Sequence, residues 1–320
     1  MKKYSLIVIF FIISIILPFF TGNFTVRFAT DILLFAIMAS AWNIIGGYTG
    51  YASFGNVVFF GLGAYLTAIF MSEELMHLNF FVAMGLSGII CAIFAFLMGI
   101  PILRLKGHYF AIATLGIAEA MKALVQNLDI TEGNSGMYLP MINLSIDASY
   151  RFFYFVALGI LIILLIATFV ILKTKLGYGF IAIREDEDAA NSMGINTTLF
   201  KCISFSISGL FTAFAGSIYA YQQGFIKPEP VFDVLVTVKM IVMAVFGGIG
   251  SLFGPLIGAA TIQIISEILS DYFLVAHALF FGTIIILMIL FSPKGIYDIF
   301  SGRKKIGLSY FLENIRKHRI

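Results

Sequence analysis

The chain has 320 residues, of which 60% are hydrophobic and only 12% are charged, and its mean hydropathy is +1.01. Since a soluble globular domain carries roughly 25% charged residues, this composition excludes an ordinary soluble domain and indicates that the solvent for most of the chain is lipid. The formal net charge of +3 is too small to indicate a nucleic-acid partner.

The sequence carries no recognisable catalytic constellation. Cys91 and Cys202 lie inside apolar runs and are interpreted as buried small hydrophobes, and the four histidines lack ligand spacing, so we expect no metal site. No phosphate-binding G-x-x-x-x-G-K-[ST] loop occurs, and no cofactor is therefore expected on this chain. If the protein depends on ATP, ATP and Mg²⁺ must bind to a partner subunit.

The first predicted elements are two apolar runs. Lys2 and Lys3 precede the run from Leu6 to Phe20, and no small-x-small cleavage site follows it, so we expect an uncleaved first span with its lysines inside. A second run covers Ile32 to Ile45.

A glycine-rich segment, GGYTGYASFGNVVFFGLGAY, follows at residues 46–65. Each glycine destabilises an isolated helix by about 0.5–1 kcal/mol relative to alanine. Membrane helices tolerate this density where they pack closely or break beside a protein-lined cavity. Helix packing and a role in the transport pathway both remain open for the candidate residues Asn43, Gly47, Gly50, Ser53 and Gly55.

Spans are predicted at 56–71 and 80–103, and a third opens at His108 after two basic residues. Counting about 1.5 Å per residue places Glu119 of this third span roughly 16 Å into the bilayer. Lys122 stands three residues further on and can pair with Glu119 on one helical face. A structural ion pair and a gate or pathway role are the two interpretations.

A polar outer loop, 129–150, and a span at 152–172 lead to the most polar internal segment of the chain. Six charged residues fall between Lys175 and Asp188, and Gly194 supplies a helix stop. We expect a short polar helix outside the bilayer, with Arg184 and Asp188 one turn apart on one face. The segment is either a solvated connector or a surface for another protein.

Four further spans are predicted at 200–221, 234–246, 256–270 and 275–291, and a basic tail follows. The segment GGIGSLFGPLIGA, residues 247–259, faintly echoes the earlier glycine-rich segment. Such an echo is either an internal repeat or a coincidence of composition. Its candidate pathway or packing residues are Gly247, Gly248 and Gly250.

The string AIREDEDAANSMGIN, residues 182–196, resembles the E-A-A-x-x-x-G coupling loop of ABC importer permeases. More narrowly, it is similar to the M-type permease family of branched-chain amino-acid ABC importers. Segments at 43–55, 103–115, 131–137 and 247–259 share that family's pattern, so the resemblance covers nearly the whole chain. Two departures are Asp188, where glutamate is usual, and Glu132, where glycine is usual.

The resemblance implies an all-α integral membrane protein of about ten transmembrane helices, with a type II ABC importer permease-like fold. We expect a permease domain over 1–300, with a cytoplasmic coupling loop at 174–198, and a basic cytoplasmic tail over 301–320. The arginines and lysines place both termini in the cytoplasm. The expected location is the bacterial cytoplasmic membrane.

The implied partners are a second permease subunit, two ATP-binding subunits and an external amino-acid-binding protein. The coupling loop would seat in a groove of an ATP-binding subunit. We expect Ala190→Glu to leave the membrane domain folded, and exposed charges such as Glu187 to matter little. The predicted coupling residues are Arg184, Glu185, Asp188, Ala189, Ala190 and Gly194.

The function that the resemblance implies is that of the translocation subunit of an ATP-driven importer for branched-chain or related hydrophobic amino acids. The alternative is a proton- or ion-coupled secondary transporter with Glu119 as its coupling carboxylate. An integral-membrane enzyme ranks last, since no catalytic residue is assigned.

Overall fold

The computed structural model describes residues 14–73, 75–272 and 282. The predicted span at 275–291, the tail at 301–320 and most of the first apolar run lie outside these residues. The larger helices are α2 (Asn23–Asn43), α3 (Asn56–Met71), α4 (Phe80–Ile102), α5 (His108–Asn127), α6 (Ile146–Leu172), α7 (Lys175–Glu185), α9 (Thr197–Gln223), α11 (Val234–Gly248) and α12 (Gly254–Tyr272). The shorter elements are η1 (Ile44–Tyr48), η2 (Asp129–Thr131), η3 (Gly133–Ser135), β1 (Met137–Tyr138), α8 (Glu187–Ser192), β2 (Phe225–Ile226) and α10 (Pro228–Val231).

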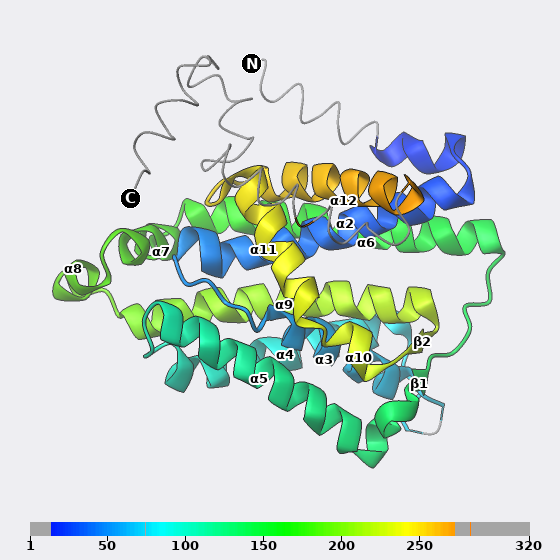
Figure 1. Ribbon diagram of the computed structural model, residues 1–320, viewed down its shortest axis with the longest axis horizontal. Coiled ribbons are helices and arrows are strands. Elements are labelled where there is room, and N and C mark those ends of the chain that lie inside the picture. Colours follow the sequence, from blue (N-terminus) through cyan, green and yellow to red (C-terminus); the bar gives the residue numbers. More distant parts are fainter. Residues whose placement is uncertain (1–13, 74, 273–281, 283–320) are drawn as a thin grey trace.

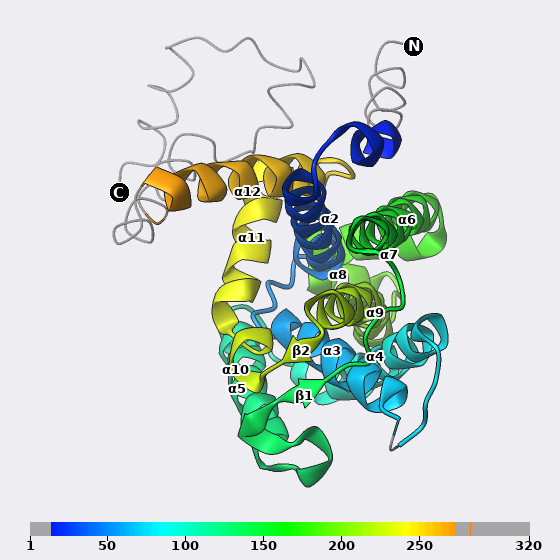
Figure 2. The same cartoon turned by 90° about the vertical axis from the view of Figure 1, so that its right-hand side faces the viewer.

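Helix α9 is the centre of the bundle. It packs most extensively against α3 and α4, and on its other side it contacts α2 and α6 (Figures 1 and 2). Glycines permit this closeness: a Cβ on Gly63 of α3 would lie 2.2 Å from the carbonyl oxygen of Ala213, and one on Gly216 of α9 would lie 2.0 Å from that of Phe60. The close approach of backbones is the usual way in which membrane helices gain packing contacts.

The two polar segments of the middle of the chain lie at opposite ends of the bundle (Figure 1). At one end are α7 and α8, and at the other the antiparallel pair of β1 and β2, in which Met137 faces Ile226 and Tyr138 faces Phe225. The two loops thus lie at opposite ends of the bundle, and their placement on opposite sides of a membrane stays a prediction.

Five helical segments of the described residues are long and apolar enough to cross a bilayer: Asn23–Tyr48, Phe80–Ile102, Ile146–Leu172, Thr197–Gln223 and Pro228–Gly248. Two shorter apolar helices are Asn56–Met71 and Gly254–Leu269. At 1.5 Å per residue, the 16 residues of α3 span about 24 Å, less than the bilayer core of about 30 Å. Helix α5 is not among the five. The predicted count of about ten spans is therefore not confirmed.

The loop after α5 tests the departure from the family pattern at Glu132. Glu132 has a φ of +55° and adopts the left-handed conformation, and Gly133 beside it has a φ of +53°. The position therefore has the backbone conformation that favours glycine. The hydroxyl of Thr131 holds the turn by donating to the carbonyl oxygens of Val125 and Leu128.

Candidate functional site

The 174–198 loop contains two helices that meet at Asp186. Asp186 has an extended backbone, with a φ of −160°, and its carboxylate accepts hydrogen bonds of 3.0 Å from the backbone N–H groups of Asp188 and Ala189. Asp186 is thus the N-cap of α8. The expectation that Arg184 and Asp188 share one helical face is wrong, because this cap ends α7 and starts a new helix. The predicted stop at Gly194 is confirmed by its φ of +86°, just beyond α8.

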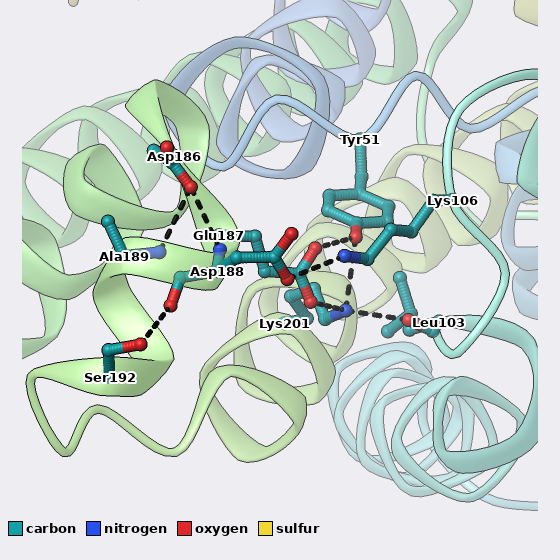
Figure 3. Close-up of polar contacts among 9 residues, drawn as sticks. All are labelled: Tyr51, Leu103, Lys106, Asp186, Glu187, Asp188, Ala189, Ser192 and Lys201. Atoms are coloured by element: carbon teal, nitrogen blue, oxygen red, sulfur yellow. Dashed lines mark hydrogen bonds and ion pairs between the residues drawn. The ribbon is translucent and has the colours of Figure 1, made fainter.

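Beneath α8 lies a group of four residues that we call the Lys201 cluster: Tyr51, Leu103, Glu187 and Lys201 (Figure 3). The Lys201 ammonium donates to Glu187 Oε1 at 2.6 Å, to the Leu103 carbonyl oxygen at 2.7 Å and to the Tyr51 hydroxyl oxygen at 3.1 Å. The Tyr51 hydroxyl donates in turn to Glu187 Oε2. The cluster therefore ties α8 to α9, to the end of α4 and to the segment after α2.

The ionic groups of the Lys201 cluster are held away from water. The side chain of Lys201 is 3% exposed and that of Glu187 is 17% exposed. Burial raises the pKa of Glu187, but the hydrogen bonds from Lys201 and Tyr51 outweigh it and leave that pKa below its ordinary value. Burial, together with the bond to Glu187, raises the pKa of the Tyr51 phenol, so that phenol stays protonated and remains a donor.

The expectation that Glu187 is an exposed charge is wrong, because only 17% of its side chain is exposed. Its carboxylate is the only acidic group bonded to Lys201 among the described residues, and a buried ion pair is strongly sensitive to loss of one partner. The expectation describes Asp188 instead: its ion pair with Lys106 has an N–O distance of 2.8 Å, with side chains that are 87% and 59% exposed. The signal that could have found the cluster is Lys201 itself, an ionisable residue inside an apolar span.

Helix α8 has an inner and an outer face. Ala190 is 3% exposed and packs with Ile183 and Cys202 in a core cluster, so its predicted place on the outer contact surface is wrong. The outer face consists of Asp188, Ala189 and Ser192, and it continues into Met193 and Gly194 just beyond the helix; all five residues are exposed. Met193, which the sequence analysis did not single out, is 85% exposed.

Arg184 points toward the membrane domain rather than away from it. Its Nη1 donates to the carbonyl oxygen of Gly47 at 3.2 Å. Asn43 connects the same place to the second glycine-rich segment: its side chain accepts from Gly250 N at 2.8 Å and donates to the Ser251 carbonyl oxygen at 3.0 Å. We call these five residues, Asn43, Gly47, Arg184, Gly250 and Ser251, the Arg184 junction.

Backbone conformation and limited space together favour glycine beside Arg184. A Cβ on Gly250 would lie 2.8 Å from Arg184 Nη1, and one on Gly50 would lie 2.9 Å from Arg184 Cγ. Both glycines also have positive φ, of +71° and +83°. The structure thus brings together two glycine-rich segments that the sequence related only by a faint echo, and it places an arginine of the 174–198 loop on both.

The remaining candidate residues lie in close contacts inside the chain. A Cβ on Gly55 would lie 2.7 Å from the Thr114 carbonyl oxygen of α5, and one on Gly247 would lie 1.8 Å from the Gly254 carbonyl oxygen at the start of α12. Ser53 is fully buried, and its carbonyl oxygen accepts from Trp42 Nε1 at 2.8 Å. Gly248 is buried at the end of α11 and has a φ of +125°.

Three other charged candidates take different places. Glu185 pairs with its neighbour Arg184 at 2.8 Å and is 69% exposed. Glu119 is exposed and Lys122 is half-buried on α5, and no ion pair joins them. The interpretation of these two residues as a structural pair is therefore not supported in this chain.

The described part of the chain holds no group of three or more histidine, cysteine, aspartate or glutamate side chains placed to bind a metal ion. Its polar side chains at the α7–α8 end are engaged in fixing a short helix against the bundle.

Comparison with known proteins gives a consistent result. A family model described as "Branched-chain amino acid transport system / permease component" matches residues 24–292. The high-affinity branched-chain amino acid transport system permease protein LivM is 30% identical to this chain in Salmonella typhimurium, over 89% of this chain and 72% of that protein, and 30% identical in Escherichia coli, over 92% and 75%. A probable LivM of Methanocaldococcus jannaschii is 24% identical, over 82% and 90%. No solved structure gives a significant match.

Proposed function

The chain belongs to the branched-chain amino acid transport permease family, and from this premise we propose that it is the translocation subunit of an ATP-driven importer for branched-chain or related hydrophobic amino acids. Its partners would be a second permease subunit, two ATP-binding subunits and an external binding protein. It would lie in the bacterial cytoplasmic membrane with both termini in the cytoplasm.

One observation carries the proposed coupling to ATP hydrolysis. Helix α8 presents a short, exposed outer face at one end of the bundle, while its inner side is fastened to three membrane-domain segments by the Lys201 cluster. A free connector needs no such fastening. A helix that transmits a displacement from a partner must be attached in this way, because a loosely held helix would move without moving the bundle.

The outer face suits a protein partner. Met193 offers a large, flexible apolar side chain beside the small side chain of Ala189, so a groove can close around the tip of the loop. Charge adds to this: Glu185, Asp186 and Asp188 give the tip an acidic character. We therefore propose that Met193 and Ala189, rather than Ala190, contact the ATP-binding subunit.

Met193→Glu is expected to release the ATP-binding subunits during affinity purification, because a charge desolvated in an apolar groove weakens the interface by at least tenfold, or about 1.4 kcal/mol. The matched control is Met141→Glu, since Met141 is 94% exposed and follows β1 by three residues. The control should keep the ATP-binding subunits. Equal retention by both variants would contradict the proposed contact, and uptake that needs a proton gradient but no ATP would contradict the importer itself.

The orientation has its own test. Single cysteines at Ser72, Asn134 and Gln223 are expected to react with a membrane-impermeant thiol reagent added from outside, whereas a cysteine at Ser192 should react only after the membrane is opened. The native Cys91 and Cys202 are both buried and should contribute little background. Labelling at Ser192 from outside would reverse the proposed orientation.

A further inference from the structure

A cavity of about 240 Å³ opens between α2, α9, α11 and α12, away from the α7–α8 end. Its wall is mostly apolar and aromatic, but it also carries a carboxylate, a phenol and two amides. The polar lining residues are Asp31, Tyr219, Gln223 and Gln263, and the apolar ones include Leu34, Phe35, Met38, Phe60 and Val236.

Asp31 is the unusual member of this lining. It lies eight residues into α2, about 12 Å from the start of a helix that is long and apolar enough to cross the bilayer. Within the described part of the chain it makes no hydrogen bond or ion pair, although Arg27 and Glu267 act on it electrostatically with opposite signs. An ionisable residue inside a membrane span is costly and usually marks a pathway or a ligand site.

Part of the cavity lies at the proposed outer end of the bundle, which is the side from which an imported solute would arrive. Gln223 is the last residue of α9, and Pro230 lies in α10, so this part of the lining sits at the end of the bundle that carries β1 and β2 (Figure 1). The rings of Phe60 and Tyr219, both of which line the cavity, pack in a tilted arrangement at a centroid distance of 5.2 Å. Part of the cavity lining therefore lies at the proposed outer end of the bundle.

We propose that this cavity binds a small solute that carries an ammonium group and a branched apolar chain, with Asp31 holding the ammonium group. A carboxylate supplies the charge-assisted hydrogen bonds that an ammonium group needs on leaving water. The apolar wall takes the chain, and the amide of Gln263 offers a donor to a carboxylate. The inference rests on the proposed function, because the cavity would be the first site on the permease to bind an amino acid that arrives from outside.

The test uses the purified complex of the permease chains and ATP-binding subunits, without the binding protein. A Gln223→Cys variant places a thiol at the exposed rim of the cavity, and its reaction rate with a small thiol reagent is measured with three probes. L-leucine carries both the ammonium and carboxylate groups, isoamylamine carries the ammonium group alone and isovalerate carries the carboxylate alone. We expect L-leucine and isoamylamine to slow labelling at least threefold and isovalerate to leave it unchanged.

The role of Asp31 is tested in the same background. Asp31→Asn keeps the size of the side chain but removes its charge, and it should abolish protection by both amines, whereas Asp31→Glu should retain protection. The matched control, Asp129→Asn at an exposed position of η2, should behave as the parent does. The inference would be overturned if the amines still slowed labelling in the Asp31→Asn variant. It would also be overturned if isovalerate slowed labelling as much as the amines do.

The outcome is separable from that of the proposed function, which is measured as ATP-dependent leucine uptake by the reconstituted complex with its binding protein. Normal uptake by the parent chain without amine protection at Gln223→Cys would reject the cavity alone. Absence of ATP-dependent uptake by the parent chain, with amine protection intact, would reject the importer and leave an amine-binding cavity.

Discussion

Glu187→Gln is expected to destabilise the folded chain by about 3–5 kcal/mol, because it leaves the ammonium group of Lys201 buried without its counter-charge. Lys201 is 3% exposed, so water cannot replace the lost partner. The measurement is the midpoint of thermal unfolding in detergent. The isosteric control is Asp188→Asn, which breaks an exposed ion pair with Lys106 and should change stability by about 0–1 kcal/mol.

A double variant separates the lost charge from a merely disturbed loop. Replacing Lys201 with methionine in the Glu187→Gln background removes the orphaned ammonium group, so most of the lost stability should return. If Glu187→Gln and Asp188→Asn lower the midpoint equally, or if the double variant is the least stable of all, the Lys201 cluster does not hold α8 as we infer.

The ion pair between Glu187 and Lys201 also predicts that stability depends on pH. The pKa of Glu187 is lower in the folded chain than its ordinary value of 4.5. Its contribution to stability is therefore fully present above that ordinary value and is lost as the pH falls through the lower folded-state value. The stability difference between the parent and Glu187→Gln should accordingly stay constant on the neutral side and shrink only in acid. A difference that disappears between pH 8 and pH 6 would contradict this assignment.

Gly47→Ala is expected to have the second large effect, because the added methyl group would lie 1.9 Å from Asn43 Oδ1 and 2.8 Å from Gly250 N. Overpacking of this kind costs about 1–3 kcal/mol. Displacing Asn43 also leaves the part-buried N–H of Gly250 without its acceptor, which costs about 1–3 kcal/mol more. The resulting loss of stability should be accompanied by weaker coupling between ATP hydrolysis and uptake, since Arg184 donates a hydrogen bond to the backbone carbonyl oxygen of Gly47 itself.

The matched control is Gly116→Ala in α5, where an added Cβ meets no atom within 4 Å. Alanine in a helix interior is favoured over glycine by about 0.5–1 kcal/mol, so this change should be neutral or slightly stabilising. Thermal midpoints and leucine-stimulated ATPase activity of the two variants provide the comparison. A Gly47→Ala complex with the stability and coupling of the Gly116→Ala complex would show that the Arg184 junction is dispensable.

The sequence alone was sufficient for several of the apolar helices and for some of their ends. The predicted spans at 56–71 and 80–103 correspond to α3 and α4, and the predicted stop at Gly194 follows α8 by two residues. These features are local: apolar length determines what a bilayer accepts, and a glycine with positive φ ends a helix wherever it occurs. The family, too, was recognisable from short motifs, and the comparisons confirm it.

Tertiary structure decided which residues of the 174–198 loop face inward. The two faces of α8 differ only by the rotation of a short helix against α9, and no local pattern reveals that Ala190 is buried while Ala189 is exposed. The partners of Lys201 and Asn43 are also remote: Tyr51 lies 150 residues from Lys201, and Gly250 lies 207 residues from Asn43. Hydropathy and spacing describe one segment at a time, whereas a buried ion pair and a close backbone contact depend on how separate segments meet in space.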